Sequence, residues 1–157
     1  MSIDKIKGSL VISLDLEMMW GNIESWSEGK YGQTNIANVP YVVDKMLELF
    51  FKYNVHATFA TVGLLMHRSK EEAVNNKPCL VPSYKRIVCS PYSNNYMENI
   101  PESRASLYFA HDLIMRIKDV KGMEIGTHTY CHYYCWEDGQ TIEESRLDLL
   151  RWRIRLQ

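Results

Sequence analysis

The sequence predicts an α/β protein, because short apolar strand patterns alternate with longer amphipathic helix patterns along the chain. Such alternation is typical of a parallel sheet whose strands are joined by helices. The 157 residues suit one domain, since domains usually run to about 100–200 residues. In chain order, the patterns lie at residues 10–18, 39–53, 56–62, 103–118, 123–125 and from 141 onward.

The first strand pattern ends in two acids. Residues 10–18 open as a nearly continuous apolar run with branched side chains, which predicts a strand buried on both faces. Asp15 and Glu17 are two residues apart, so they lie on the same side of an extended chain. Two carboxylates near a core are costly unless a positive group lies between them, and a metal ion is such a group. The alternative is a strand that runs out into a charged loop.

The next two elements follow from spacing and end residues. Apolar side chains at helical spacing, with Pro40 near the start, predict a core-packing helix over residues 39–53 that Asn54 closes. Residues 56–62 are the second strand. His56 lies at its beginning, opposite the end that carries the acids in the first strand, so we expect a structural role for His56.

Residues 64–104 break the alternation. They contain four prolines, several tyrosines and a Ser-Asn-Asn cluster. A connection of this length is uncommon in a compact domain and is usually functional or mobile. Because it follows the second strand, one hypothesis is a lid or a wall of a substrate groove. The alternative is a surface insertion with one short helix at about residues 69–75.

The last three elements are an amphipathic helix over residues 103–118, a strand at 123–125 and a helix from residue 141. The spacing of Ile142, Leu147, Leu150 and Ile154 indicates the final helix. Its start carries two glutamates and its end three arginines, which is the polarity that the helix dipole favours.

Two histidines follow the third strand. If a helical turn begins after Gly126, His128 and His132 point the same way, because residues four apart share a helix face. They can then give two nitrogen ligands to one divalent ion, and a hydrolytic zinc site needs two or three such ligands plus an open position for water. Together with Glu17 they make a two-histidine, one-carboxylate site, with Asp15 as a spare proton acceptor. The alternative is two polar residues in a surface loop.

Three segments in this order resemble the polysaccharide deacetylases, also called the NodB homology domain. The resemblance implies that Asp15 is the catalytic base and that Glu17, His128 and His132 bind the metal. The more usual first motif has two adjacent aspartates, so the spaced acids look like a variant. The matching segments are SLDLE at residues 13–17, HATFATVG at 56–63 and HTYCH at 128–132.

The family resemblance also implies a fold and a reaction. The fold is a partial, distorted (β/α) barrel, and the reaction is metal-dependent hydrolysis of a non-peptide carbon–nitrogen bond, commonly removal of acetyl from an N-acetylated sugar or polysaccharide. Zinc is the default ion, although imidazole–carboxylate sites also accept other divalent ions. The family's later arginine and histidine motifs are absent, so we expect residues 1–157 to be a truncated, amino-terminal part of such a domain. A catalytically inactive fragment that retains the metal site is the alternative.

Aromatic residues near the two motifs are candidates for binding the sugar. Trp20, Tyr133 and Tyr134 are expected to line the substrate pocket. Trp26 and Tyr31 lie with Trp20 in the loop after the first strand and could also stack on a sugar ring. For Trp20, Trp26 and Tyr31, the alternative is that they are buried residues that anchor the loop.

Charge and cysteine content exclude other classes. A net charge of −1 offers no electrostatic case for nucleic acid or an anionic membrane. No signal-type or membrane-length apolar stretch occurs, so a cytoplasmic location is expected, with the four cysteines as free thiols. Cys131 and Cys135 invite a zinc-knuckle hypothesis, but such sites need a second close pair of ligands, which is missing. The oligomeric state does not follow from the sequence.

Overall fold

The computed structural model describes residues 8–23 and 34–156, and its centre is a three-stranded parallel sheet. Strand β2 (Ala57–Thr61) lies between β1 (Ser13–Leu16) and β3 (Met123–Thr127). In the register, Asp15 pairs with Ala60, and Ala60 pairs with Gly126. The carboxyl ends of the strands therefore lie together at one end of the sheet, where the two predicted motifs meet.

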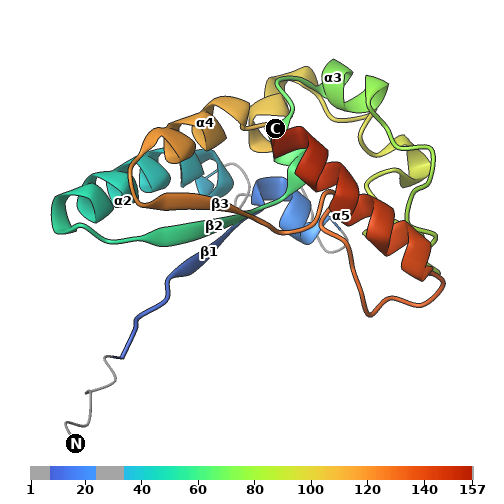
Figure 1. Cartoon of the computed structure of the whole chain (residues 1–157). Helices are drawn as coiled ribbons and strands as arrows, with labels where there is room; N and C mark the ends of the chain where they lie inside the picture. The colour runs from blue at the N-terminus through green and yellow to red at the C-terminus, as the bar shows by residue number, and fades with distance from the viewer. Residues whose placement is uncertain (1–7, 24–33, 157) are drawn as a thin grey trace, which may run out of the picture.

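Two helices cover one face of this sheet, as Figure 1 shows for α2 and α4. Leu16 and Phe59 are buried on the covered face, whereas Ser13, Asp15 and Glu124 are exposed on the other. The mixed α/β class is confirmed, but the described strands form an open sheet and no barrel. No helix in the described ranges has the length and apolarity needed to cross a membrane. The α-helices are α2 (Val39–Tyr53), α3 (Lys70–Asn75), α4 (His111–Asp119) and α5 (Ile142–Leu156). Short 3-10 helices occur at Met18–Asn22, Ile36–Asn38, Gly63–Met66, Ile87–Cys89, Ser93–Asn95 and Glu102–Leu107.

Helix α2 forms as predicted. Pro40 lies in its first turn, where a missing N–H costs no helical hydrogen bond. Its own residues Val43 and Leu47 are buried. Asn54 ends the helix in the left-handed conformation, at φ 51°, and its N–H donates to the Phe50 carbonyl.

Strand β1 is an edge strand, so the prediction that residues 10–18 are buried on both faces is wrong. Leu10 and Val11 are 87% and 82% exposed. The ladder reaches back only to Ile12, whose carbonyl accepts the Thr58 N–H. Apolar composition alone could not show that this strand has a neighbour on one side only within the described sheet.

The helix predicted over residues 103–118 is broken in the structure. A 3-10 helix ends at Leu107 and α4 begins only at His111. Two tertiary hydrogen bonds occupy the backbone between them. The Tyr108 carbonyl accepts the Trp20 indole N–H at 2.7 Å, and the Ala110 N–H donates to the Leu65 carbonyl at 2.9 Å. A backbone carbonyl and a backbone N–H that a continuous helix would use are therefore hydrogen-bonded to other segments.

Residues 64–104 lie beyond the carboxyl ends of the strands (Figure 1). The predicted short helix is present as α3, capped by Ser69, whose hydroxyl accepts the Glu72 N–H. Tyr92, Met97 and Ile100 from this segment are buried in the main core cluster. The segment therefore belongs to the core of the domain.

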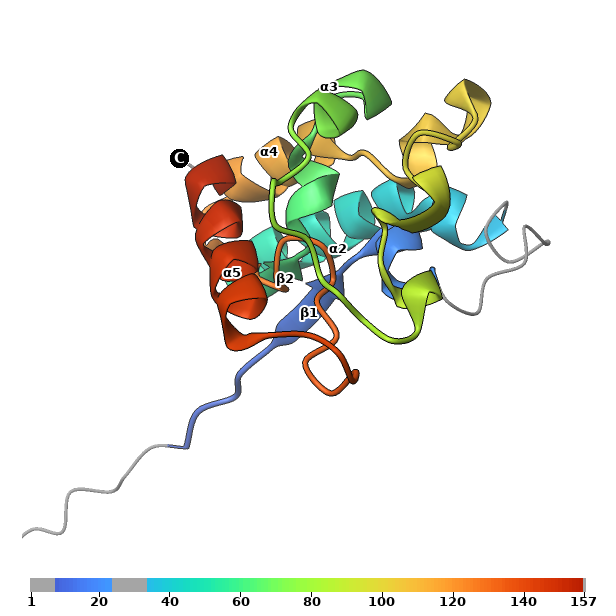
Figure 2. The ribbon, with the colours of Figure 1, turned by 90° about the vertical axis from the view of Figure 1, so that its right-hand side faces the viewer.

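Helix α5 forms where it was predicted, but the side chains that indicated it are not its buried ones. Ile142 and Ile154 are 89% and 70% exposed. The buried side chains of α5 are instead Glu144, Asp148 and Trp152. The helix packs beside β3 and the Gly63–Met66 turn, along one side of the domain (Figure 2).

Candidate metal centre

Three potential ligands converge at the carboxyl edge of the sheet. Glu17 follows β1, and His128 follows β3, with His132 four residues farther along. The Glu17 Oε2 atom lies 3.2 Å from His128 Nε2 and 3.0 Å from His132 Nε2. Among the described residues, these three side chains form the one cluster with metal-ligand character, and their ligand atoms all lie within 4.8 Å of one another.

The histidine pair is brought together by a loop, so the predicted helical turn is wrong. Thr129 and His132 both adopt left-handed backbone conformations, at φ 62° and 55°. Such conformations cost a non-glycine residue about 1 kcal/mol or more. Two hydroxyls help to hold the loop: Thr127 Oγ1 accepts the Thr129 N–H, and Thr129 Oγ1 accepts the Tyr133 N–H at 2.6 Å.

The same loop is docked against the end of β2 through its backbone. The His128 N–H donates to the Thr61 carbonyl, and the Gly63 N–H donates to the Thr129 carbonyl, both at 3.0 Å. A Cβ at Gly63 would lie 2.9 Å from the Tyr130 Cα, so this contact requires glycine. The glycine at the end of the second motif segment thus has a direct role in placing the third.

The electrostatics of the cluster are those of a carboxylate between two imidazoles. Hydrogen bonds from His128 and His132 lower the pKa of Glu17 to about 2, although partial burial acts in the opposite direction. The hydrogen bond to Glu17 in turn raises the pKa of His128 above its ordinary value. Glu17 is therefore readily ionised while His128 holds its proton more firmly, and a metal ion would have to displace that proton.

The donor set and its spacing fit a small divalent ion. Ligand atoms about 2.0–2.2 Å from a tetrahedral ion lie about 3.3–3.6 Å from one another. The observed separations of 3.0 and 3.2 Å need only a small outward movement of Glu17. His132 Nδ1 is buried without a hydrogen-bond partner in the described part of the chain, so Nε2 is the nitrogen that faces the cluster.

Asp15 lies beside this cluster but outside it. Its Oδ1 atom is 3.8 Å from His128 Nδ1, which is too long for a hydrogen bond. The Asp15 side chain is 61% exposed on the open face of the sheet. Asp15 and Glu17 therefore approach opposite nitrogens of the His128 ring, and the Asp15 carboxylate remains accessible from solvent.

Trp20, one of the predicted substrate contacts, lies in the core of the structure. Its indole is fully buried, donates to the Tyr108 carbonyl, and packs edge-on against the Tyr108 ring at 5.1 Å. The alternative of a buried loop anchor is the observed one. Trp26 and Tyr31 lie outside the described residues.

The two tyrosines after His132 differ in environment. Tyr133 is buried, and its hydroxyl donates to the Thr141 carbonyl, so it packs as a core residue; its contact with a substrate stays a prediction. Tyr134 is partly buried, and its ring centroid lies 5.0 Å from that of His132. Tyr134 therefore packs its ring against a potential metal ligand.

The cysteines do not form the alternative thiolate site. All four are free, and Cys131 is buried while Cys135 is exposed. Burial and the nearby Asp148 carboxylate raise the pKa of the Cys131 thiol, which disfavours the thiolate that zinc needs. Within the described ranges, neither residue joins a group of metal ligands.

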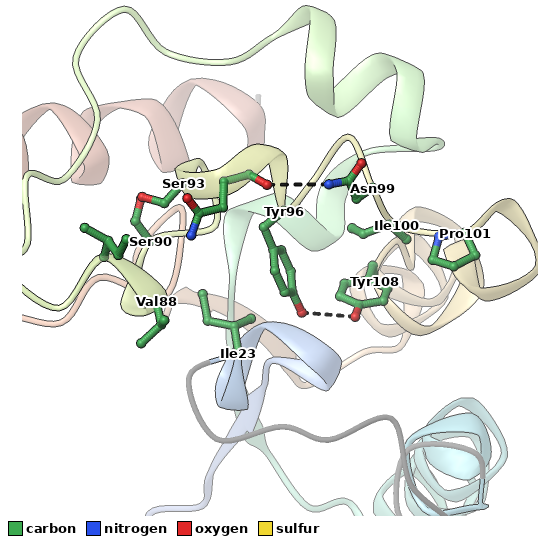
Figure 3. A pocket seen from close by; sticks show the side chains of 11 residues that line it. Ile23, Val88, Ser90, Ser93, Tyr96, Asn99, Ile100, Pro101 and Tyr108 are labelled. Carbon is green, nitrogen blue, oxygen red and sulfur yellow. Dashed lines mark hydrogen bonds between the residues drawn. The ribbon is translucent and has the colours of Figure 1, made fainter.

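A cavity of about 360 Å³ lies elsewhere, between the end of the first 3-10 helix and the segment after α3 (Figure 3). Ile23, Val88 and Ile100 form apolar walls, and the hydroxyls of Tyr96 and Tyr108 meet at 3.1 Å. The described residues that line it include no histidine, cysteine or carboxylate. The described lining of this cavity therefore contains none of the usual protein ligands of zinc.

The loop that carries the two histidines, residues 128–132, is called the ligand loop below. Two residues that support it were not identified from the sequence. Gly63 was recognised only as part of a motif segment. Asp148 was hidden in the final helix, although its spacing of four residues from Glu144 places both acids on one helix face. That spacing was the available signal, and the exposed leucines and isoleucines of α5 obscured it.

The comparison with known proteins leaves the family resemblance untested. The chain matches no protein-family model, no curated protein sequence and no solved structure. The resemblance to polysaccharide deacetylases therefore rests on the three motif segments, and any function must be argued from the cluster itself.

Proposed function

We propose that this protein is a divalent-metal-dependent amide hydrolase of the polysaccharide deacetylase type, which removes acetyl groups from an N-acetylated sugar or polysaccharide. The observation that carries the proposal is the convergence of Glu17, His128 and His132, which come from the two ends of the described chain, within hydrogen-bonding distance of one point. In this proposal the three-stranded sheet is part of a distorted (β/α) barrel.

The residues divide the chemistry between them. A zinc ion held by Glu17, His128 and His132 would supply Lewis-acid chemistry, by lowering the pKa of a water molecule and polarising the amide carbonyl. Asp15, exposed on the open face of the sheet, accepts the proton of the attacking water. Tyr134, next to His132, forms one side of the approach to this point.

Acetate release from N-acetylated oligosaccharides tests the proposal. Protein stripped with a chelator should be inactive and should regain activity with zinc. Asp15→Asn should bind zinc normally but lose turnover by about 10²–10⁴-fold, because it removes the general base. His132→Ala should lose zinc and turnover together. Glu124→Gln is the matched control, since Glu124 is another exposed acid on the same sheet face, bonded to Thr58. Full turnover by Asp15→Asn would refute the assignment of the base, and failure of the native protein to bind zinc would refute the proposal.

A second candidate is a metal-binding protein that catalyses no hydrolysis. It is favoured by the positions of the other histidines, because an amide nitrogen needs a proton to leave and a positioned acid contributes about 10²–10⁴-fold. His67 is buried against Tyr130, His111 is bonded to Asp112, and His56 precedes β2 at the opposite end of the sheet. Tight zinc binding by the native protein without acetate release would select this candidate.

A further inference from the structure

Helix α5 turns a row of polar side chains toward the domain. Glu144, Asp148, Trp152 and Arg155 are spaced by four, four and three residues, so they lie on one helix face. Each makes hydrogen bonds to a segment that precedes α5 in the chain. This face, unlike the apolar face of an ordinary core helix, makes hydrogen bonds to backbone and side-chain groups of earlier segments.

Asp148 binds the middle of the ligand loop. Its Oδ2 atom accepts the Tyr130 N–H at 2.6 Å, and its Oδ1 atom accepts the Cys131 N–H at 3.1 Å. These two N–H groups lie between His128 and His132 in the chain. The Asp148 side chain is buried, so water cannot readily replace it as their acceptor.

The two N–H groups require a carboxylate in particular. Both oxygens of an ionised aspartate accept hydrogen bonds, whereas an asparagine has one acceptor oxygen and one donating amide nitrogen. With asparagine at position 148, either Tyr130 or Cys131 would present its N–H to another donor. The next turn of α5 reinforces the grip, because the Trp152 indole donates to the Thr61 carbonyl, which also accepts the His128 N–H.

We propose that Asp148 is a positioning residue of the metal centre, which holds residues 129–132 in the conformation that brings His128 and His132 to Glu17. The inference rests on the proposed metal site, and it does not depend on which substrate the protein uses. Within the described chain, Asp148 makes its hydrogen bonds to the backbone between two ligands, and it acts on their side chains through that backbone.

Glu144 provides a matched control on the same helix. It lies one turn earlier, is equally buried, and also accepts backbone hydrogen bonds, from Ser83 at 3.2 Å and Thr141 at 3.0 Å. Those partners lie outside the ligand loop. Glu144→Gln should therefore alter the same face of α5 without changing how the loop presents its histidines.

The experiment measures the zinc dissociation constant by competition with a chromophoric chelator, at a temperature well below unfolding of every variant. Asp148→Asn should bind zinc about 10–100-fold more weakly than the native protein, as is usual when the support of a metal ligand is removed. Glu144→Gln should stay within about twofold, although both variants should unfold at a lower temperature than the native protein. Native affinity in Asp148→Asn, or equal weakening in Glu144→Gln, would overturn the proposal.

Two further measurements keep the test decisive. If Asp148→Asn does not fold, Asp148→Glu retains the charge but moves the carboxylate by one methylene, and it should also weaken zinc binding. In the native protein, the Tyr130 and Cys131 amides should exchange hydrogen as slowly as the amides of α5. Faster exchange would refute the proposal that Asp148 holds this part of the loop. Zinc binding without acetate release would contradict only the proposed function, whereas absence of zinc binding by the native protein would overturn both.

Discussion

Acidification should weaken the fold through His67, which is buried in a polar network behind the ligand loop. Its Nε2 atom lies 2.8 Å from the Tyr130 hydroxyl, and its Nδ1 atom lies 2.7 Å from the Arg155 guanidinium. Since a guanidinium can only donate, Nδ1 must accept, and the ring is neutral with its proton on Nε2. Burial, and then the positive charge of Arg155, lower the pKa of His67 to about 4.

The size and direction of the effect follow from this shift. In the unfolded chain the imidazole binds a proton near pH 6.5, whereas in the folded protein it does so only near pH 4. The unfolded state therefore takes up more protons in this range, and the stability present above pH 6.5 is lost as the pH falls toward 4. The difference corresponds to about 3 kcal/mol, since each pKa unit is about 1.4 kcal/mol.

Urea denaturation of the metal-free protein between pH 7 and pH 4 measures this loss. His67→Gln keeps hydrogen-bonding capacity but cannot titrate, so its free energy of unfolding should fall by about 3 kcal/mol less than that of the native protein. His56→Gln is the substitution control, because it replaces an exposed histidine outside this network. The depressed pKa of Glu17 acts in a lower window, between its ordinary value and about 2. Parallel profiles for His67→Gln and the native protein would refute the reasoning.

Two further predictions concern the metal centre. Gly63→Ala should abolish or greatly weaken zinc binding and lower the melting temperature, because the new Cβ would lie 2.9 Å from the Tyr130 Cα; Gly8→Ala, with no atom within 4 Å of its Cβ, is the control, and native zinc affinity in Gly63→Ala would contradict the docking argument. Zinc affinity should fall as the pH drops through the pKa of His128, because the hydrogen bond to Glu17 raises that pKa and zinc must displace the proton. Calorimetry in buffers of different ionisation enthalpy measures the protons released, and binding at pH 6.5 without proton release would refute this prediction.

The sequence alone was sufficient where the controlling interactions are local. The bounds of α2 follow from its apolar spacing, Pro40 and Asn54, which all act within a turn of the helix. Asp15 and Glu17 were identified because a strand alternates its side chains. His128 and His132 were identified by residue type and spacing, although the helical turn invoked for them is absent.

Only the tertiary structure decided how distant segments use one another's polar groups. Trp20 is buried because its indole N–H meets the Tyr108 carbonyl, a partner 88 residues away. The same hydrogen bond helps to interrupt the helix predicted over residues 103–118, between Leu107 and His111. No periodicity within either segment encodes this contact, since hydrophobic patterns report only which side of an element faces inward.

The final helix shows the physical reason most clearly. Ile142 and Ile154 belong to the pattern that predicted this helix, yet both are exposed. The surface that α5 covers is loop backbone, whose buried N–H groups must be hydrogen-bonded and therefore select acids such as Asp148. Composition determined that a helix would form here, whereas the unsatisfied donors of the ligand loop determined which of its faces turned inward.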